Sequence, residues 1–125
     1  MTAADRPTAV GPYSPVVRNG EWVVCSGQLG LVDGAPADGV AEQVRLALAS
    51  LERLLAGEGA TLHDVVKTTV FLTDIADFAE MNAAYGAAFG GHRPARSAVA
   101  VVALPLGARV EIEAWAHRGG EGVTR

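Results

Sequence analysis

The sequence predicts an α+β fold in which two helices cover one face of a β-sheet. Two segments carry apolar residues at helical spacing, and a segment rich in β-branched residues separates them. Near the N-terminus an Asn-Gly pair lies between two apolar runs, and two further apolar segments follow the second helical stretch. These observations predict the element order β-β-α-β-α-β-β.

The first two strands are expected to form a hairpin. Residues Pro15 to Arg18 and Glu21 to Ser26 flank Asn19-Gly20, a pair that tolerates the positive φ angles of a tight hairpin turn. Residues Gly27 to Gly39 then contain four glycines, one proline and two aspartates, a composition typical of a surface loop. This loop is long enough to line a binding site.

A helix is predicted from Val40, ending at Gly57 and Gly59, and a strand from Val65 to Thr73. A second helix is expected after Asp74, which can cap it, and Gly90-Gly91 should end it. The apolar stripe of the first helix comprises Val40, Val44, Ala47, Leu48, Leu51, Leu54 and Leu55, and that of the second Ile75, Phe78, Asn82, Tyr85 and Phe89.

The last two strands are predicted at Pro94 to Leu104 and Ala108 to His117, joined by a turn. Two helices can cover only one face of the sheet. Yet the segment Ala98 to Leu104 is apolar on both faces, as is Val65-Val66 with Val70 to Leu72. We therefore expect a homo-oligomer whose subunits pack sheet face against sheet face.

Composition narrows the possible functions. The 125 residues, 50% of them hydrophobic, carry a formal net charge of −4, which predicts one acidic domain over residues 1–125. Without a cluster of basic residues, nucleic acid and anionic membrane surfaces are poor partners. The longest apolar run, Ala98 to Leu106, is far shorter than the roughly 20 residues of a membrane-spanning helix. The polar first residues, Met1 to Arg6, lack the apolar core of a signal peptide, so a cytoplasmic location is expected.

Neither a metal nor a cofactor is expected. The three histidines, His63, His92 and His117, are far apart in the sequence and are interpreted as surface residues. The segment around Gly27 lacks the spacing of a nucleotide-binding loop. The single cysteine, Cys25, lies in an apolar stretch and is interpreted as a buried, structural thiol.

The last strand carries the first candidates for chemistry. Its small apolar residues alternate with Glu111, Glu113, Trp115 and His117, so the glutamates should lie on the face away from the helices. A carboxylate in a subunit cleft could polarise a water molecule, and Arg96 could bind a substrate carboxylate through its planar guanidinium. Arg96 and Glu111 thus form a candidate pair. The alternatives are glutamates on a solvated edge strand and an ordinary surface arginine.

Six short motifs, spread over nearly the whole chain, occur in the order and spacing of one known family. They are Gly11-Pro12-Tyr13-Ser14-Pro15, Cys25-Ser26-Gly27-Gln28, Val66 to Asp74, Pro94-Ala95-Arg96-Ser97, Leu104-Pro105 and Val110 to Ala114. With these motifs the chain resembles the reactive intermediate deaminases, also called the RidA or YjgF family. The resemblance implies a chorismate-mutase-like α+β fold, a homotrimer, and three active sites in the clefts between subunits.

The resemblance also implies an activity, the hydrolysis of 2-enamine and 2-imine acids, such as 2-aminoacrylate, 2-iminopropanoate and 2-iminobutanoate, to 2-keto acids and ammonia. By motif, Arg96 matches the arginine that binds the substrate carboxylate, Glu111 the glutamate near the attacking water, and Tyr13 a tyrosine that helps close the pocket. Ser26, Gly27 and the main chain around Ala98 would line the rest, and no cofactor is required.

The chain departs from the family pattern at several positions. Ala98 stands where many members have a cysteine, Gly30 stands where a proline is frequent, and the segment from Gly86 to Arg93 is short. Two other functions therefore stay open. One is a pathway-specific deaminase of a larger amino-unsaturated acid, and the other is a non-catalytic, regulatory or chaperone-like binder of small carboxylates. The ribonuclease activity also linked to the family has the least support in an acidic chain.

Overall fold

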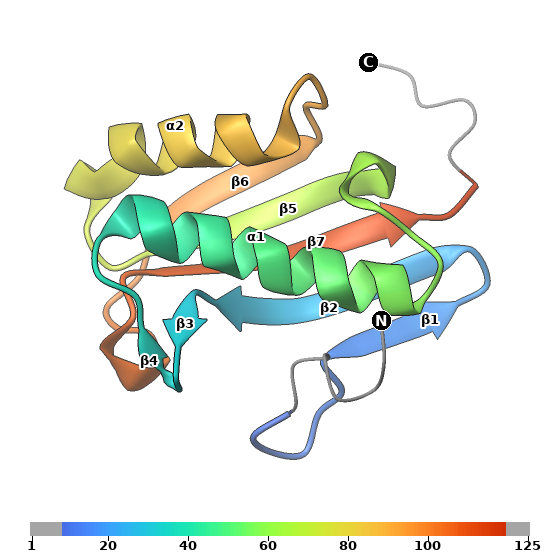
Figure 1. The fold of residues 1–125 in the computed structure, drawn as a ribbon, viewed down its shortest axis with the longest axis horizontal. Helices are drawn as coiled ribbons and strands as arrows, with labels where there is room; N and C mark the ends of the chain where they lie inside the picture. Colours follow the sequence, from blue (N-terminus) through green and yellow to red (C-terminus); the bar gives the residue numbers. More distant parts are fainter. Residues whose placement is uncertain (1–8, 120–125) are drawn as a thin grey trace.

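Five strands form one mixed sheet, and both helices lie on the same face of it, as the computed structural model of residues 9–119 shows (Figure 1). The strands are β1 (Val16–Asn19), β2 (Trp22–Leu29), β5 (Val65–Leu72), β6 (Ala95–Ala100) and β7 (Val110–His117), and the helices are α1 (Val40–Gly57) and α2 (Phe78–Phe89). The predicted α+β fold is confirmed, and these seven elements follow one another in the predicted order, with two short strands added between β2 and α1.

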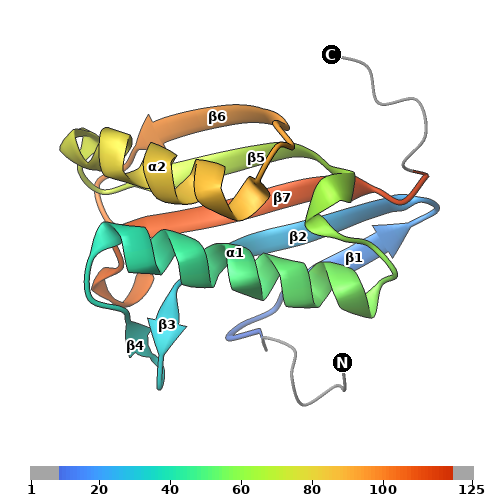
Figure 2. The same ribbon diagram turned by 45° about the horizontal axis from the view of Figure 1, so that its top comes forward.

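The strand order in the sheet is β1-β2-β7-β5-β6. All neighbouring pairs are antiparallel except β5 and β6, which are parallel because α2 carries the chain back across the sheet between them. The last strand, β7, therefore lies in the middle of the sheet, while β1 and β6 form its two edges (Figure 2).

The N-terminal hairpin is confirmed, with its turn one residue later than expected, because Asn19 pairs with Trp22 across Gly20 and Glu21. The predicted loop from Gly27 to Gly39 is partly wrong. Strand β2 continues to Leu29, and a small hairpin follows, made of β3 (Leu31–Val32) and β4 (Ala35–Pro36). Its turn residues Asp33 and Gly34 have φ angles of 51° and 82°, the conformation that an Asp-Gly pair favours.

Helix α1 buries its apolar stripe as predicted. In α2 the prediction is wrong at the N-terminal end, since the buried residues are Met81, Tyr85 and Phe89, whereas Ile75 is 57% and Phe78 36% exposed. The reason is local. Residues Ile75–Asp77 form a 3₁₀ turn, whose tighter winding shifts Ile75 away from the stripe that the α-helical period projects. Asp74 caps this turn by accepting a hydrogen bond from the Ala76 N–H.

The alternation in β7 is confirmed. Val110, Ile112, Ala114 and Ala116 are fully buried under the helices, so the residues between them lie on the uncovered face, called here the open face. Large apolar side chains are exposed on it, namely Val17, Trp22, Val99 and Trp115. Strand β6 is shorter than predicted, because it ends at Ala100 and the chain leaves the sheet before the turn at Pro105–Gly107.

Cys25 is buried, as expected, and burial raises the pKa of its thiol to about 12. The interpretation of His92 as a surface residue is wrong. Its Nε2 atom lies 2.7 Å from the Val65 carbonyl oxygen, and its ring packs against Phe89. No group of three potential metal ligands occurs within residues 9–119. In the same part of the chain, no helix has the length and apolar character needed to cross a membrane.

The close approach of Gly30 to α1 yields a stability prediction. A Cβ atom at Gly30 would lie 2.1 Å from the Gln43 carbonyl oxygen, which belongs to helix backbone and cannot move aside cheaply. We expect Gly30→Ala to lower the free energy of unfolding by about 2 kcal/mol or more. Urea denaturation at one protein concentration measures this. Gly91→Ala is the matched control, because no atom of the described residues lies within 4 Å of its added methyl group. Unchanged stability of Gly30→Ala would contradict the tight contact.

Candidate active site

Glu111 occupies the open face at the centre of the sheet, between Leu29 of β2 and Phe71 of β5. Its carboxylate lies directly on the main chain of Gly27, where a Cβ atom would be only 2.6 Å from Oε2. This approach is possible because β2 bulges between Cys25 and Gln28, which moves its backbone out of regular pairing. Position 27 therefore has to be glycine for Glu111 to keep this place.

The surroundings of Glu111 favour its protonated form. Partial burial, and secondly the negative charge of Glu113, raise the pKa of the Glu111 carboxyl. Within residues 9–119, no group donates a hydrogen bond to this carboxylate and no cation pairs with it. A half-buried carboxylate that lacks donors is more basic than one in water, so Glu111 can accept a proton from a bound water molecule.

Ser26 attaches the N-terminal segment to this part of the sheet. Its hydroxyl donates to the Ser14 carbonyl oxygen at 2.7 Å, and its N–H donates to the Pro15 carbonyl oxygen at 2.8 Å. These bonds fix the chain next to Tyr13, a residue that is 50% exposed. The structure thus places Ser26, Gly27 and Glu111 together, with the segment of Tyr13 anchored beside them.

Arg96 lies on the edge strand β6, beneath helix α2. Its Cζ atom is 4.9 Å from the ring centroid of Tyr85 and 5.5 Å from that of Phe78, and its Nη1 atom is 3.9 Å from the sulfur of Met81. Tyr85 is itself held by a 2.6 Å hydrogen bond to Thr68. The rings attract the cation without neutralising it. Because no described carboxylate pairs with Arg96, its charge is available to an anionic ligand.

Ala98 is the next residue on the same side of β6, where it pairs with Val70. The N–H of Val101 donates to the Leu72 carbonyl oxygen. Because main-chain groups alternate in direction along a strand, those of Val99 and Ser97 also face β5, and those of Arg96 and Ala98 face the free edge. This edge carries hydrogen-bonding groups that the sheet leaves unused, and they are open to a ligand or another chain.

The expected pair of Arg96 and Glu111 does not form within one chain. Arg96 pairs with Thr68, whose side chain is buried on the helix face, whereas Glu111 pairs with Phe71 on the open face. Strand β5 also separates the two. The candidate residues therefore form two half-sites, one containing Tyr13, Ser26, Gly27 and Glu111 and the other containing Arg96 and Ala98.

Sequence analysis missed the rings that hold Arg96. The helical spacing of Phe78 and Tyr85 predicted that they share one face of the second helix and belong to the core. It did not predict that their rings contact Arg96. Helix α2 lies over the edge strand β6, whose residues are partly exposed. Aromatic side chains of such a helix can therefore contact a partly exposed arginine instead of filling the core. Only the parallel pairing of β5 with β6 puts Arg96 under these rings.

Comparison with known proteins identifies relatives along nearly the whole chain. The family model described as "Endoribonuclease L-PSP" matches residues 3–118. The 2-iminobutanoate/2-iminopropanoate deaminase of Mus musculus is 44% identical over 122 residues, which cover 95% of this chain and 90% of the relative. The protein of the same name from Salmonella typhimurium is 43% identical over 123 residues, covering 94% and 96%.

Solved structures with the same fold include three bacterial proteins. The YjgF gene product of E. coli is 40% identical with a TM-score of 0.86, covering 91% of this chain and 94% of its own. E. coli TdcF, solved with bound serine, is 36% identical with a TM-score of 0.88 over 94% and 97%. RidA from an Antarctic Psychrobacter is 38% identical with a TM-score of 0.87, again over 94% and 97%. From the match of the family model to residues 3–118 and these relatives, the chain belongs to the RidA/YjgF family.

Proposed function

We propose that this protein hydrolyses 2-imine and 2-enamine acids, such as 2-iminopropanoate and 2-iminobutanoate, to 2-keto acids and ammonia. The observation that carries the proposal is the state of Arg96, a cation held by two aromatic rings with no described carboxylate partner. The half-buried Glu111, to which no residue of the described part of the chain donates a hydrogen bond, supports it from the other half-site. Relatives more than 40% identical are named as deaminases of these two acids.

In the proposed complex, the guanidinium of Arg96 binds the substrate carboxylate with two parallel hydrogen bonds. The main-chain groups of Ala98 at the free edge add hydrogen bonds to the imine end of the substrate. This role does not depend on the side chain at position 98, so the alanine that replaces the frequent cysteine of the family is compatible with it. The exposed part of the Phe78 ring offers apolar contact to the rest of the substrate.

The active site is proposed to lie between subunits of a homotrimer. Arg96 and Glu111 face opposite sides of their own sheet, so one substrate can meet both only if each comes from a different copy of the chain. Arg96 and Ala98 of one subunit would then face Tyr13, Ser26, Gly27 and Glu111 of its neighbour. The exposed Val17, Val99 and Trp115 on the open face support subunit contact there.

The chemistry follows from the placement of a water molecule between Glu111 and the substrate. The water oxygen forms a bond to the carbon of the protonated imine, one water proton passes to the Glu111 carboxylate, and the C=N electron pair moves to nitrogen, which becomes a neutral amine. Glu111 then returns this proton to nitrogen. The C–N bond breaks and ammonia leaves with its electron pair, while the O–H electron pair of the new hydroxyl forms the carbonyl and the hydroxyl proton passes to the Glu111 carboxylate.

The iminium carbon is already electrophilic, so the proposed route needs orientation and proton transfer rather than a cofactor. A positioned general base contributes roughly 10²- to 10⁴-fold. This is enough for a substrate that also hydrolyses unaided. The proposed location of this activity is the cytoplasm.

Two other functions use the same residues differently. A deaminase of a larger amino-unsaturated acid would use the exposed Phe78 ring beside Arg96 as its apolar wall. A non-catalytic binder of small carboxylates would need Arg96 but not Glu111. The ribonuclease named in the family description gains no support from a chain with a net charge of −4.

Removing the Arg96 guanidinium should abolish substrate binding. We expect Arg96→Ala to lower kcat/KM about 100-fold or more, because the carboxylate loses two charge-assisted hydrogen bonds. The assay generates the imine with a dehydratase and compares keto acid formed with imine trapped by semicarbazide. Arg53→Ala is the control, since Arg53 is an exposed arginine on α1. Full activity of Arg96→Ala would rule out this role.

The activity should depend on pH through Glu111. As a general base, Glu111 must be ionised, so the rate falls as the pH drops through its pKa, which lies above the ordinary value for glutamate. Glu113→Gln removes one cause of that upward shift, and the acidic limb of the kcat/KM profile should move to lower pH. Glu111→Gln should remove the limb and lower kcat roughly 10²- to 10⁴-fold. A limb that stays in Glu111→Gln belongs to another group.

Mixing two inactive variants tests the shared site. In oligomers assembled from equal amounts of Arg96→Ala and Glu111→Gln, some sites combine an intact Arg96 from one copy with an intact Glu111 from the other. Random assembly should restore about one quarter of wild-type activity, because each intact half occurs with a probability of about one half. A site built within one chain would give no recovery. Mass measurement on the same samples reports whether the oligomer is a trimer.

A further inference from the structure

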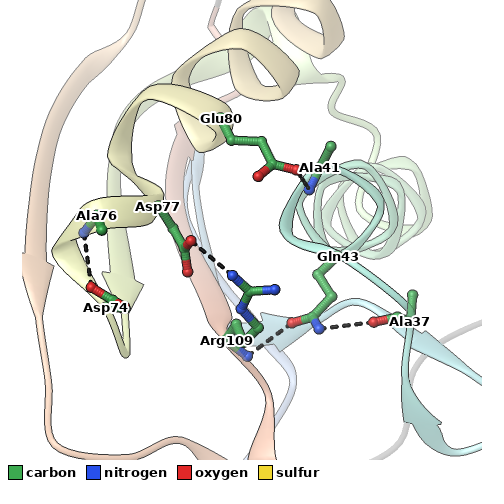
Figure 3. Close-up of polar contacts among 8 residues, drawn as sticks. All are labelled: Ala37, Ala41, Gln43, Asp74, Ala76, Asp77, Glu80 and Arg109. Atoms are coloured by element: carbon green, nitrogen blue, oxygen red, sulfur yellow. Dashed lines mark hydrogen bonds and ion pairs between the residues drawn. The ribbon is translucent and has the colours of Figure 1, made fainter.

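A polar network joins both helices to the start of β7 (Figure 3). Gln43 of α1 is its buried centre, only 3% exposed. Its Oε1 atom accepts from the Arg109 N–H at 2.9 Å, and its Nε2 atom donates to the Ala37 carbonyl oxygen at 2.8 Å. The amide of Gln43 therefore connects the residue before β7 with the segment that follows β4.

Arg109 is held at three points. Besides its N–H, its carbonyl oxygen accepts from the Thr73 N–H at 3.1 Å, just after β5. Its guanidinium Nη2 lies 2.8 Å from Oδ1 of Asp77, the residue that precedes α2. The backbone that enters β7 is thus tied to α1, β5 and α2 together.

The network lies next to the half-site of Glu111. Arg109 is two residues before Glu111, and the Val110 between them is fully buried. Gln43 also lies close to the end of β2. Its backbone packs on Gly30, the residue after Leu29, and Leu29 pairs with Glu111 across the sheet. Gln43 therefore contacts both the start of β7 and the residue that follows β2, three residues beyond Gly27, on which the Glu111 carboxylate rests.

The same network reaches the half-site of Arg96. Asp77 is followed directly by Phe78, whose ring lies over the Arg96 guanidinium. A second tie runs from the first turn of α2 to that of α1, since Glu80 accepts from the Ala41 N–H at 3.4 Å. The position of Phe78 thus depends on how α2 begins, which the bond from Asp77 to Arg109 restrains.

Stability alone does not account for this arrangement. Buried polar groups lower stability unless they are fully bonded, and Oδ2 of Asp77 is buried without a hydrogen-bond partner in the described structure. Apolar side chains of similar size could fill the same space without that penalty. The polar groups instead fix the relative orientation of the backbone segments that they join, because hydrogen bonds depend on distance and angle more strictly than apolar contacts do.

We propose that Gln43 and Asp77 are positioning residues that act through Arg109. Gln43 keeps the Glu111 carboxylate on Gly27, and Asp77 keeps Phe78 over Arg96, so one network sets the geometry of both half-sites. This inference rests on the proposed hydrolysis, in which Glu111 moves protons and Arg96 binds the carboxylate. The two residues should consequently affect different kinetic constants.

Gln43→Met replaces the amide by an apolar side chain of similar length. We expect kcat to fall about 10- to 100-fold with little change in KM, because a displaced base affects proton transfer more than binding. Asp77→Asn and Arg109→Met weaken the tie to α2, and each should raise KM about 10-fold. Arg109→Lys can restore the ion pair and should recover most of that loss.

Leu54→Ala is the control for a purely structural effect. Leu54 is fully buried in α1, about three turns beyond Gln43, so the variant is destabilised without touching the network. Its kcat and KM should equal those of the wild type at temperatures where both are folded. If Gln43→Met and Asp77→Asn change kinetics no more than Leu54→Ala, or if both change the same constant, the proposal is overturned.

A measurement without substrate separates this proposal from the proposed function. The Glu111 carboxyl is titrated by NMR in protein with labelled glutamate, and Glu111→Gln assigns the signal. The charged neighbour of Glu111 on its own strand is Glu113, and its neighbours across the sheet are the apolar Leu29 and Phe71. Lys67 lies further along β5, opposite Trp115. Gln43→Met should lower the pKa of Glu111, because a carboxylate released from Gly27 gains water, whereas Leu54→Ala should not.

The outcomes are distinct. If wild-type protein does not hydrolyse the imines but Gln43→Met still shifts the Glu111 titration, the positioning role stands and the proposed function fails. If the wild type is active and the titration and kcat of Gln43→Met are unchanged, the positioning role fails and the proposed function stands. An inactive wild type with an unmoved titration overturns both.

Discussion

The alternation of side chains along β7 is the constraint on which the rest of this structure depends. Its four small apolar residues, from Val110 to Ala116, are fully buried beneath the two helices. In a strand this forces Glu111 and Glu113 to the opposite face. Since β7 lies in the middle of the sheet, Glu111 is surrounded by neighbouring strands and half-buried even on the uncovered side. The packing of the core therefore also determines where the candidate base lies.

The sheet also separates the candidate residues. Arg96 belongs to the helix face at one edge, and Glu111 belongs to the open face at the centre, with β5 between them. A β-sheet is a rigid layer, so no side-chain motion within one chain can join the two. Chemistry that uses both must therefore occur where two copies meet. The apolar side chains exposed on the open face favour the association of two copies through that face.

Each half-site contains a charged group whose surroundings do not compensate its charge, which lowers the stability of the folded chain. Among residues 9–119, Arg96 packs on the rings of Phe78 and Tyr85 and no carboxylate pairs with it, while Glu111 lies on Gly27 and no group donates to it. Unpaired charges at a half-exposed site are costly by themselves, but they are the groups that a charged ligand and a water molecule can satisfy. The network around Gln43 holds the backbone at the places where these groups are attached.

The sequence by itself determined the features that depend on short-range rules. Turn chemistry predicted the hairpin after Asn19, the 3.6-residue period predicted the buried face of α1, and alternation predicted the two faces of β7. Only the tertiary structure decided that β7 inserts between β2 and β5, that His92 is buried, and that rings of α2 enclose Arg96. These features come from contacts between residues far apart in the chain, and their register follows from how the whole core packs rather than from any local pattern.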